Sequence, residues 1–264
     1  MIQSLKKLNA ALCCVKFDLR AIILSIVELP RYFKDRIRFN SLQGQSGWAL
    51  RNYPVLLDRN AGAALLGEYF WQDLFVAKEI IKKNPKLHID IGSRIDGFIA
   101  HLACVRSVKV FDIRPLSAKI ENVEFIQWDI TNPNAELRGL ADCVSCLHTL
   151  EHIGLGRYGD KLDPDGWKKG LESLVDLVAP GGGLWLSVPI GIQRVEFNAH
   201  RVFDPATIIH AASELEMTLA GFFYLSDAGI RESLSLDDDV ESLARKNYSL
   251  GIFLFSKDKD ESFK

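Results

Sequence analysis

The chain has 264 residues, of which 48% are hydrophobic and 25% are charged, and its net charge at pH 7 is −2. This composition is typical of a folded protein with enough apolar material for a sizeable core. A net charge this close to zero does not favour a nucleic-acid partner, so we expect none. The five cysteines are an odd number and three of them lie in apolar runs, which indicates reduced thiols and a cytoplasmic protein.

The N-terminal 40 residues are basic. They hold eight Lys/Arg and three Asp/Glu, so their net charge is 8 − 3 = +5 and that of the remainder is −2 − 5 = −7. The apolar runs 11–15 and 21–27 are each too short to span a membrane. A basic, partly amphipathic segment suits an anionic membrane surface, so peripheral membrane association is one expectation. The alternative is a solvated helical face packed on its own domain.

The composition changes near Pro85, and we place a domain boundary there. Residues 1–85 are expected to form a helical N-terminal extension or lid, with helices over 4–29, 31–39 and 61–84. Aromatic residues recur at helical spacing over 68–75, which favours a packing face over a binding motif. Residues 86–264 are expected to form the main domain.

Short apolar runs alternate with amphipathic stretches throughout residues 86–264. This alternation predicts an α/β fold with a doubly wound, mostly parallel sheet. Strands are predicted over 86–91, 107–113, 123–128, 141–147, 183–188, 219–225 and 249–255, and helices over 97–104, 165–178 and 205–215. The acidic run Asp237–Asp239 is expected to be a solvated loop, because it lacks the glycine and the spaced ligands of a calcium site.

Candidate ligand-binding residues follow the predicted strands, at the sheet edge where open α/β folds bind their ligands. Gly92 follows the first strand and allows a sharp turn close to a ligand. Asp112 ends the second strand, twenty positions after Gly92, where an acid can accept hydrogen bonds from both ribose hydroxyls of an adenosine. Trp128 and Asp129 end the third strand, which places an aromatic face and an acceptor near an adenine ring.

Two further motifs follow in order. The fourth strand leads into Leu147–His152, with the sequence Leu-His-Thr-Leu-Glu-His, and Pro180–Gly183 forms a helix-stopping turn before the fifth strand. Each motif is weak alone, but their order and spacing together are unusual.

With these motifs, the chain from about Lys86 to Phe255 resembles class I S-adenosylmethionine-dependent methyltransferases. It is most similar to a poorly characterised methyltransferase-like family with an Asp-Ile-Gly-Ser first loop and an upstream Tyr-Phe-x-Gln-Asp motif, which here is Tyr69–Asp73. The resemblance implies a seven-stranded Rossmann-like sheet whose last strand is antiparallel. It also implies S-adenosylmethionine as cofactor, with His148, Glu151 and His152 at the mouth of the site. The cofactor contacts that we expect are Asp90, Gly92, Ser93, Arg94, Asp112 and Asp129.

The first loop departs from the family pattern. The family has glycines at alternate positions after the acid, whereas this chain has Gly92, Arg94 and Asp96, with Gly97 one position late. Three hypotheses explain this departure. The loop takes a different path through Gly97, or the affinity for the cofactor is reduced or lost, or Arg94 pairs with the cofactor carboxylate.

Histidines are the candidate general bases for an oxygen acceptor, because their pKa lies near neutrality. We favour His152 or His200, with His148 as a further candidate and Glu151 as a residue that orients a histidine or contacts the acceptor. A structural hydrogen-bonding role is the alternative for each histidine. The loop Gly154–Gly166 is expected to be a mobile edge of the acceptor site.

Other functions fit the motifs less well. His148–His152 matches a zinc-protease pattern, but it straddles a strand end and has no helix to align its histidines, so no metal site is expected. A dinucleotide oxidoreductase needs a fuller glycine fingerprint. The leading hypothesis is O-methylation of a sugar, glycan or other small hydroxyl compound, with a role in polysaccharide biosynthesis. The alternative is a methyltransferase-fold protein without catalysis that acts in binding or as a scaffold.

Overall fold

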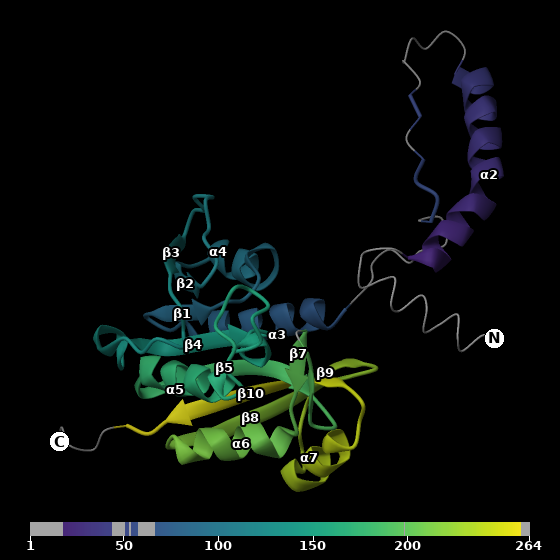
Figure 1. Ribbon diagram of the computed structural model, residues 1–264. Coiled ribbons are helices and arrows are strands. Elements are labelled where there is room, and N and C mark those ends of the chain that lie inside the picture. The colour runs from purple at the N-terminus through teal and green to yellow at the C-terminus, as the bar shows by residue number, and fades with distance from the viewer. Residues whose placement is uncertain (1–17, 44–50, 53, 58–66, 198, 260–264) are drawn as a thin grey trace. The chain divides into compact units, whose positions relative to one another are not determined.

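The computed structural model describes residues 18–43, 51–52, 54–57, 67–197 and 199–259 (Figure 1). The chain divides into two compact units, residues 1–65 and 66–264, which are treated separately. The predicted helical residues 4–17 and 61–66 lie outside the described residues, as do Cys13 and Cys14.

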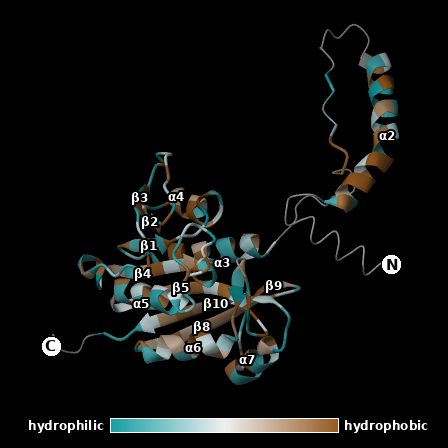
Figure 2. Cartoon of the chain, viewed as in Figure 1, coloured by the Kyte–Doolittle hydropathy of each residue, from teal (hydrophilic) through white to brown (hydrophobic). Residues whose placement is uncertain are grey.

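The described part of the first unit is dominated by helix α2, Leu19–Gln43. We predicted that Pro30 would separate two helices, and this is wrong, because α2 continues through Pro30. Proline removes one backbone hydrogen bond from a helix, and here that loss does not end it. Figure 2 shows hydrophobic residues gathered in the first half of α2 and mostly hydrophilic residues in its second half.

The second unit is built on one eight-stranded sheet in the order β3-β2-β1-β4-β5-β10-β8-β9. The strands are β1 (His88–Ile91), β2 (Val108–Asp112), β3 (Val123–Gln127), β4 (Ala141–Leu147), β5 (Val178–Ile190), β8 (Met217–Ser226), β9 (Gly229–Glu232) and β10 (Ser249–Lys257). The first five pair in parallel, and β10 is antiparallel to both β5 and β8. The seven predicted strands and the antiparallel last strand are therefore confirmed, and β9 adds an eighth at the edge.

Two short features differ from the predicted pattern. The predicted Pro180–Gly183 turn lies inside β5, where the register with β4 shifts and Gly181 has φ +77°. Strands β6 (Arg194–Glu196) and β7 (His200–Val202) form a separate two-stranded hairpin that was not predicted. At three residues each, these strands are too short to show an alternating pattern.

Helices cover both faces of the sheet and bury its alternating side chains (Figure 1). One face packs against α5 (Gly166–Leu177), α6 (Pro205–Glu214) and α7 (Leu236–Ala244). The other packs against α3 (Glu68–Lys83), a π-helical turn η2 (Ile95–Ile99) and α4 (Ala100–Ala103). The remaining elements are the 3-10 turns η3 (Ala135–Leu137) and η4 (Leu150–His152).

Helix α3 belongs to the same unit as the sheet, although we predicted that the main domain begins only at residue 86. Its Val76 and Ile80 are fully buried in the second core. Its polar side also points inward, because Ser187 of β5 donates a 2.5 Å hydrogen bond to Gln72. The hydrophobic pattern identified the helix but not the surface on which it packs.

The acidic run Asp237–Asp239 forms the first turn of α7 rather than a loop, which corrects our prediction. Carboxylates in the first turn of a helix interact favourably with its dipole, so these three acidic residues stabilise the start of α7. Cys143 and Cys146 are buried, unpaired thiols in β4.

Candidate active site

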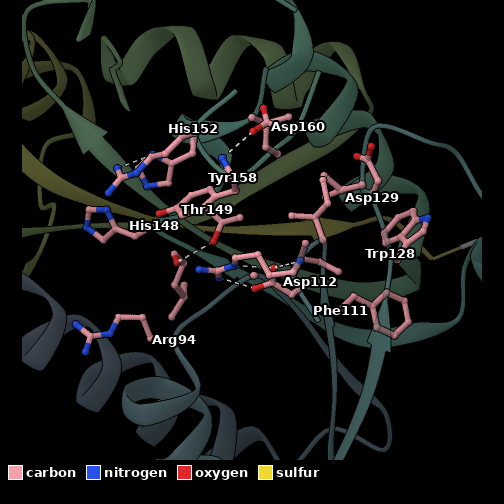
Figure 3. Close-up of a pocket in the computed structure, with 18 of the residues that line it drawn as sticks. Arg94, Phe111, Asp112, Trp128, Asp129, His148, Thr149, His152, Tyr158 and Asp160 are labelled. Atoms are coloured by element: carbon pink, nitrogen blue, oxygen red, sulfur yellow. Dashed lines mark hydrogen bonds and ion pairs between the residues drawn. The ribbon is translucent and has the colours of Figure 1, made fainter. Parts of the chain in front are cut away.

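A cavity of about 330 Å³ lies beyond the carboxyl ends of β1, β2, β3 and β4 (Figure 3). The strand order reverses between β1 and β4, which is the place where doubly wound sheets bind ligands. Figure 3 shows Arg94, His148 and His152 at one end of the cavity and Trp128 and Asp129 at the other. Its lining is Tyr69, Ile91, Gly92, Arg94, Phe111, Asp112, Ile113, Arg114, Trp128, Asp129, Ile130, Leu147, His148, Thr149, His152, Ile153, Arg157, Tyr158 and Asp160.

Gly92 turns the chain at the end of β1 against the end of β4. Its φ is +70°, a conformation that side chains disfavour. A Cβ at this position would lie 2.5 Å from Thr149 Cγ2. Glycine is therefore required twice, for the backbone conformation and for the close approach of the two strand ends.

Asp90 lies behind this turn and does not line the cavity. It accepts hydrogen bonds from Ser145 Oγ at 2.6 Å and from Ser93 through both Oγ (2.6 Å) and the backbone N–H (3.1 Å). Burial raises the pKa of Asp90 to about 7, against the opposing effect of these hydrogen bonds. Asp90 and Ser93 thus hold the shape of the loop from within.

Arg94 and Asp96 pair with each other at the surface. The guanidinium donates to the carboxylate at 3.1 and 2.9 Å, and it also lies over the ring of Tyr69. Gly97 faces α3: a Cβ there would collide with the carboxylate of Asp73. The two charged residues that depart from the family pattern therefore neutralise one another, and Gly97 makes room for α3.

Asp112 carries an unexpected partner. Arg114 donates to its two oxygens from Nε at 3.0 Å and from Nη2 at 2.6 Å, and the Arg114 backbone N–H adds a third bond at 2.8 Å. The Arg114 guanidinium also lies 4.7 Å from the ring centroid of Tyr158. The acid expected to bind ribose is thus held by an arginine that lines the same cavity.

The far end of the cavity combines an acid with an aromatic ring. Asp129 accepts from Thr131 N–H at 2.9 Å and Thr131 Oγ1 at 2.8 Å, both through Oδ1. Trp128 stands edge-on to Phe111, with centroids 5.7 Å apart, and donates its indole N–H to the carbonyl of Asn132. Asp129 Oδ2 has a single long bond, at 3.3 Å from Asn132, and so retains capacity for a ligand donor.

Glu151 lies between two histidines at the near end. Its Oε1 is 2.8 Å from His148 Nδ1 and 3.5 Å from His152 Nε2. His148 has φ +52°, which is uncommon for a residue with a side chain. Burial alone lowers the pKa of His148, but the charge and hydrogen bond of Glu151 outweigh it, so the pKa is raised.

His152 is oriented by a backbone carbonyl. Its Nδ1 lies 2.6 Å from the oxygen of Ala199, and because a carbonyl only accepts, Nδ1 carries the proton. The neutral ring therefore has its lone pair on Nε2, the nitrogen nearest Glu151. Burial lowers the pKa of His152, which favours this neutral form near pH 7.

The structure brings six of the ten predicted site residues to the cavity: Gly92, Arg94, Asp112, Asp129, His148 and His152. Asp90, Ser93 and Glu151 support these from behind, and His200 lies outside the lining, against the ring of Tyr248. Among the residues that the structure describes, no cluster of three metal-binding side chains occurs.

Several lining residues were not identified from the sequence. Tyr69 belongs to the aromatic stretch that we assigned to packing, and its ring does contact His148, at 4.8 Å between centroids. Arg114, Arg157 and Tyr158 carry no motif. Within the predicted loop 154–166, Asp160 accepts backbone N–H bonds from Gly154, Gly156 and Tyr158, which hold residues 154–160 in a compact turn.

Comparison with known proteins gives a family and a fold. Residues 110–249 match the family described as Caenorhabditis protein of unknown function, DUF268. No curated protein matches the sequence.

Solved structures resemble the chain at low sequence identity. The [4+2]-cyclase SpnF is 10% identical, with 76% of this chain and 86% of that chain covered and a TM-score of 0.53. The N-methyltransferase NodS from Bradyrhizobium japonicum is 14% identical, with coverage of 77% and 100% and a TM-score of 0.51. The 1,6-didemethyltoxoflavin-N1-methyltransferase from Burkholderia thailandensis, solved with S-adenosylhomocysteine, is 13% identical, with coverage of 79% and 100% and a TM-score of 0.50. At such identities the likeness shows the methyltransferase fold and not the reaction.

Proposed function

We propose that this protein catalyses S-adenosylmethionine-dependent methyl transfer to a hydroxyl acceptor. The chain belongs to the DUF268 family, whose function is unknown, so the proposal is argued from the residues of the cavity. The observation that carries the proposal is the arrangement along one cavity. Gly92, Asp112 and Asp129 lie beside the strand ends where a nucleoside fits, and the His148–Glu151–His152 group lies at the other end.

The residues that line the cavity suit the chemistry of the cofactor. Gly92 lines the cavity and, without a side chain, lets the end of β1 turn close beside Thr149. Asp112 offers carboxylate oxygens for ribose hydroxyls, and Asp129 and Trp128 offer an acceptor and a ring face for adenine. When bound, S-adenosylmethionine supplies an electrophilic methyl group on a positively charged sulfur.

We propose His152 as the general base. Its neutral Nε2 can accept the proton of an acceptor hydroxyl, while the Nδ1–H bond to Ala199 holds the ring in place. The resulting imidazolium would lie 3.5 Å from the Glu151 carboxylate, which stabilises the positive charge. Glu151 is a positioning residue, held in turn by His148.

The proposed acceptor is a sugar, glycan or other small hydroxyl compound. Polar groups from histidine, tyrosine and arginine surround the end of the cavity that holds His152, which suits a polar acceptor more than an apolar one. A base that is neutral near pH 7 is also better matched to a hydroxyl than to a carbon acceptor.

Calorimetric titration with S-adenosylmethionine tests the cofactor assignment. We expect the wild type to bind with a dissociation constant in the micromolar range and Asp112→Ala to bind about tenfold more weakly or worse, because two hydroxyl partners are lost. Asp227→Ala, at an exposed turn between β8 and β9, is the matched control and should bind as the wild type does. A wild type that shows no binding at millimolar cofactor would overturn the proposal.

A second candidate is a binding or scaffold role without catalysis. The three bonds from Arg114 to Asp112 favour it, since they occupy the acid that a ribose would need. The same titration separates the two functions, because a scaffold that does not use the cofactor gives no heat of binding.

We also propose that α2 associates with an anionic membrane surface. Its apolar side chains Ile23, Ile26, Val27, Phe33 and Ile37 are all more than half exposed. Between Leu19 and Gln43, five Lys/Arg and two Asp/Glu give 5 − 2 = +3, which complements acidic headgroups. In the part of the chain that the structure describes, no helix has the length and hydropathy needed to cross a bilayer.

A further inference from the structure

Arg157 stands at the mouth of the cavity beside the proposed base. Its Nη1 donates to the Ala199 carbonyl at 2.8 Å, the same oxygen that accepts from His152. Its guanidinium carbon lies 5.2 Å from the centroid of the Tyr158 ring. Nη1 also lies 3.3 Å from His152 Nδ1. These three contacts hold the guanidinium next to His152 and leave its Nε and Nη2 donors without a protein acceptor among the described residues.

The other arginines of the cavity are already paired with carboxylates. Arg94 is paired with Asp96, and Arg114 with Asp112. The Asp160 carboxylate accepts three backbone N–H bonds. Within the described ranges, Arg157 is the cavity arginine that no carboxylate approaches to ion-pair distance.

We propose that Arg157 binds an acidic group, a carboxylate or a phosphate, on the methyl acceptor, an inference that rests on the proposed function. A guanidinium presents parallel N–H donors that match either anion. Arg157 itself is exposed, so the acid group would stay at the mouth while the hydroxyl enters toward His152.

The Ala199 carbonyl holds His152 and Arg157 next to each other. Because His152 and Arg157 both bind the Ala199 oxygen, the acid group and the reacting hydroxyl must lie close together on one acceptor. An acidic sugar or another hydroxy acid meets this requirement, and a neutral polyol does not. The acceptor class thus narrows from hydroxyl compounds in general to those with a neighbouring negative charge.

Anion titrations of the full chain test the inference. NMR titrations of side-chain signals with sodium acetate and with inorganic phosphate give affinities for the two anion classes. We expect Arg157→Gln to weaken the binding of the preferred anion about tenfold, and Arg157→Lys less, because lysine keeps the charge but not the paired donors. Arg138→Gln removes an exposed arginine outside the cavity and is the matched control.

Cofactor calorimetry on the same proteins separates the two proposals. Arg157→Gln should bind S-adenosylmethionine as the wild type does, since Arg157 lies at the acceptor end. Equal anion affinity in the Arg157→Gln and Arg138→Gln variants, or binding of neither anion by the wild type, would overturn the acidic acceptor while leaving the cofactor site intact. Cofactor binding that is absent while anion binding depends on Arg157 would instead overturn the methyltransferase proposal alone.

Discussion

Gly92 brings the backbones of β1 and β4 close together at the cavity. Gly92→Ala should reduce the free energy of unfolding by about 2–4 kcal/mol, because it adds a strained positive φ and a collision with Thr149. Cofactor binding should be lost with it. Chemical denaturation and calorimetry measure the two effects.

Gly139→Ala is a suitable control for the backbone contribution. Gly139 has φ +65°, close to that of Gly92, but nothing lies within 4 Å of the Cβ position. The excess cost at Gly92 therefore measures the collision alone, and Thr149→Ala should recover part of it in the double variant. Equal losses at both glycines would contradict the proposed contact.

Arg114 competes with ribose for the oxygens of Asp112. Arg114→Gln should tighten cofactor binding by up to about fivefold, the equivalent of about 1 kcal/mol for an ion pair whose arginine is half exposed. Calorimetry compares it with Arg138→Gln, which breaks an exposed ion pair elsewhere. Weaker binding in Arg114→Gln would mean that the arginine positions Asp112 for the ligand rather than competing with it.

Asp90 links stability to pH. Its pKa rises from 3.8 to about 7 on folding, chiefly through burial, so its favourable contribution is present at low pH and is lost as pH rises toward 7. Asp90→Asn has no titrating group there. The melting temperature of the variant minus that of the wild type should therefore increase between pH 5 and 7 and level off above pH 7, as expected for one titrating carboxyl group. A difference that does not vary with pH would contradict the raised pKa.

Among the helices and strands, α2 is the one for which we propose membrane association. The variant Lys34→Gln/Arg38→Gln should reduce binding to vesicles that contain about 30% phosphatidylserine by about thirtyfold, because two basic residues are lost at about 1 kcal/mol each. Co-sedimentation measures this, with Lys82→Gln/Lys119→Gln in the second unit as the charge-matched control. Equal binding of all three proteins, or equal binding to vesicles of pure phosphatidylcholine, would exclude an electrostatic role for α2.

Local sequence patterns predicted the strands well, because a buried parallel strand requires a short apolar run whatever its neighbours are. They predicted the residues at the strand ends for the same reason, since Asp112 and Asp129 follow from where β2 and β3 end. They did not predict Arg114 as the partner of Asp112, because nothing in the spacing of these two residues shows that their charges pair. Nor did they show that Gln72 meets Ser187, a contact between residues 115 positions apart.

For the molecule as a whole, the boundary between units predicts which truncations fold. A chain that begins at Gly67 keeps α3 and should unfold at nearly the same temperature as the full chain. One that begins at Lys86 loses the buried Val76 and Ile80 and should be destabilised by about 3–6 kcal/mol, comparable with the whole stability of a domain. Circular dichroism melting distinguishes them, and cooperative unfolding of the shorter chain at the full-chain temperature would contradict this role for α3.

The first turn of α3 has a consequence for how the site is completed during synthesis. Glu68 accepts a 2.9 Å hydrogen bond from the hydroxyl of Tyr248, a residue 180 positions later, and lies 3.9 Å from His148. Helix α3 leaves the ribosome 180 residues before this partner does. Strand β10, which joins β5 to β8, begins directly after Tyr248. A nascent chain can therefore pair its five parallel strands first, and the sheet and the Glu68–Tyr248 hydrogen bond beside His148 are then completed together.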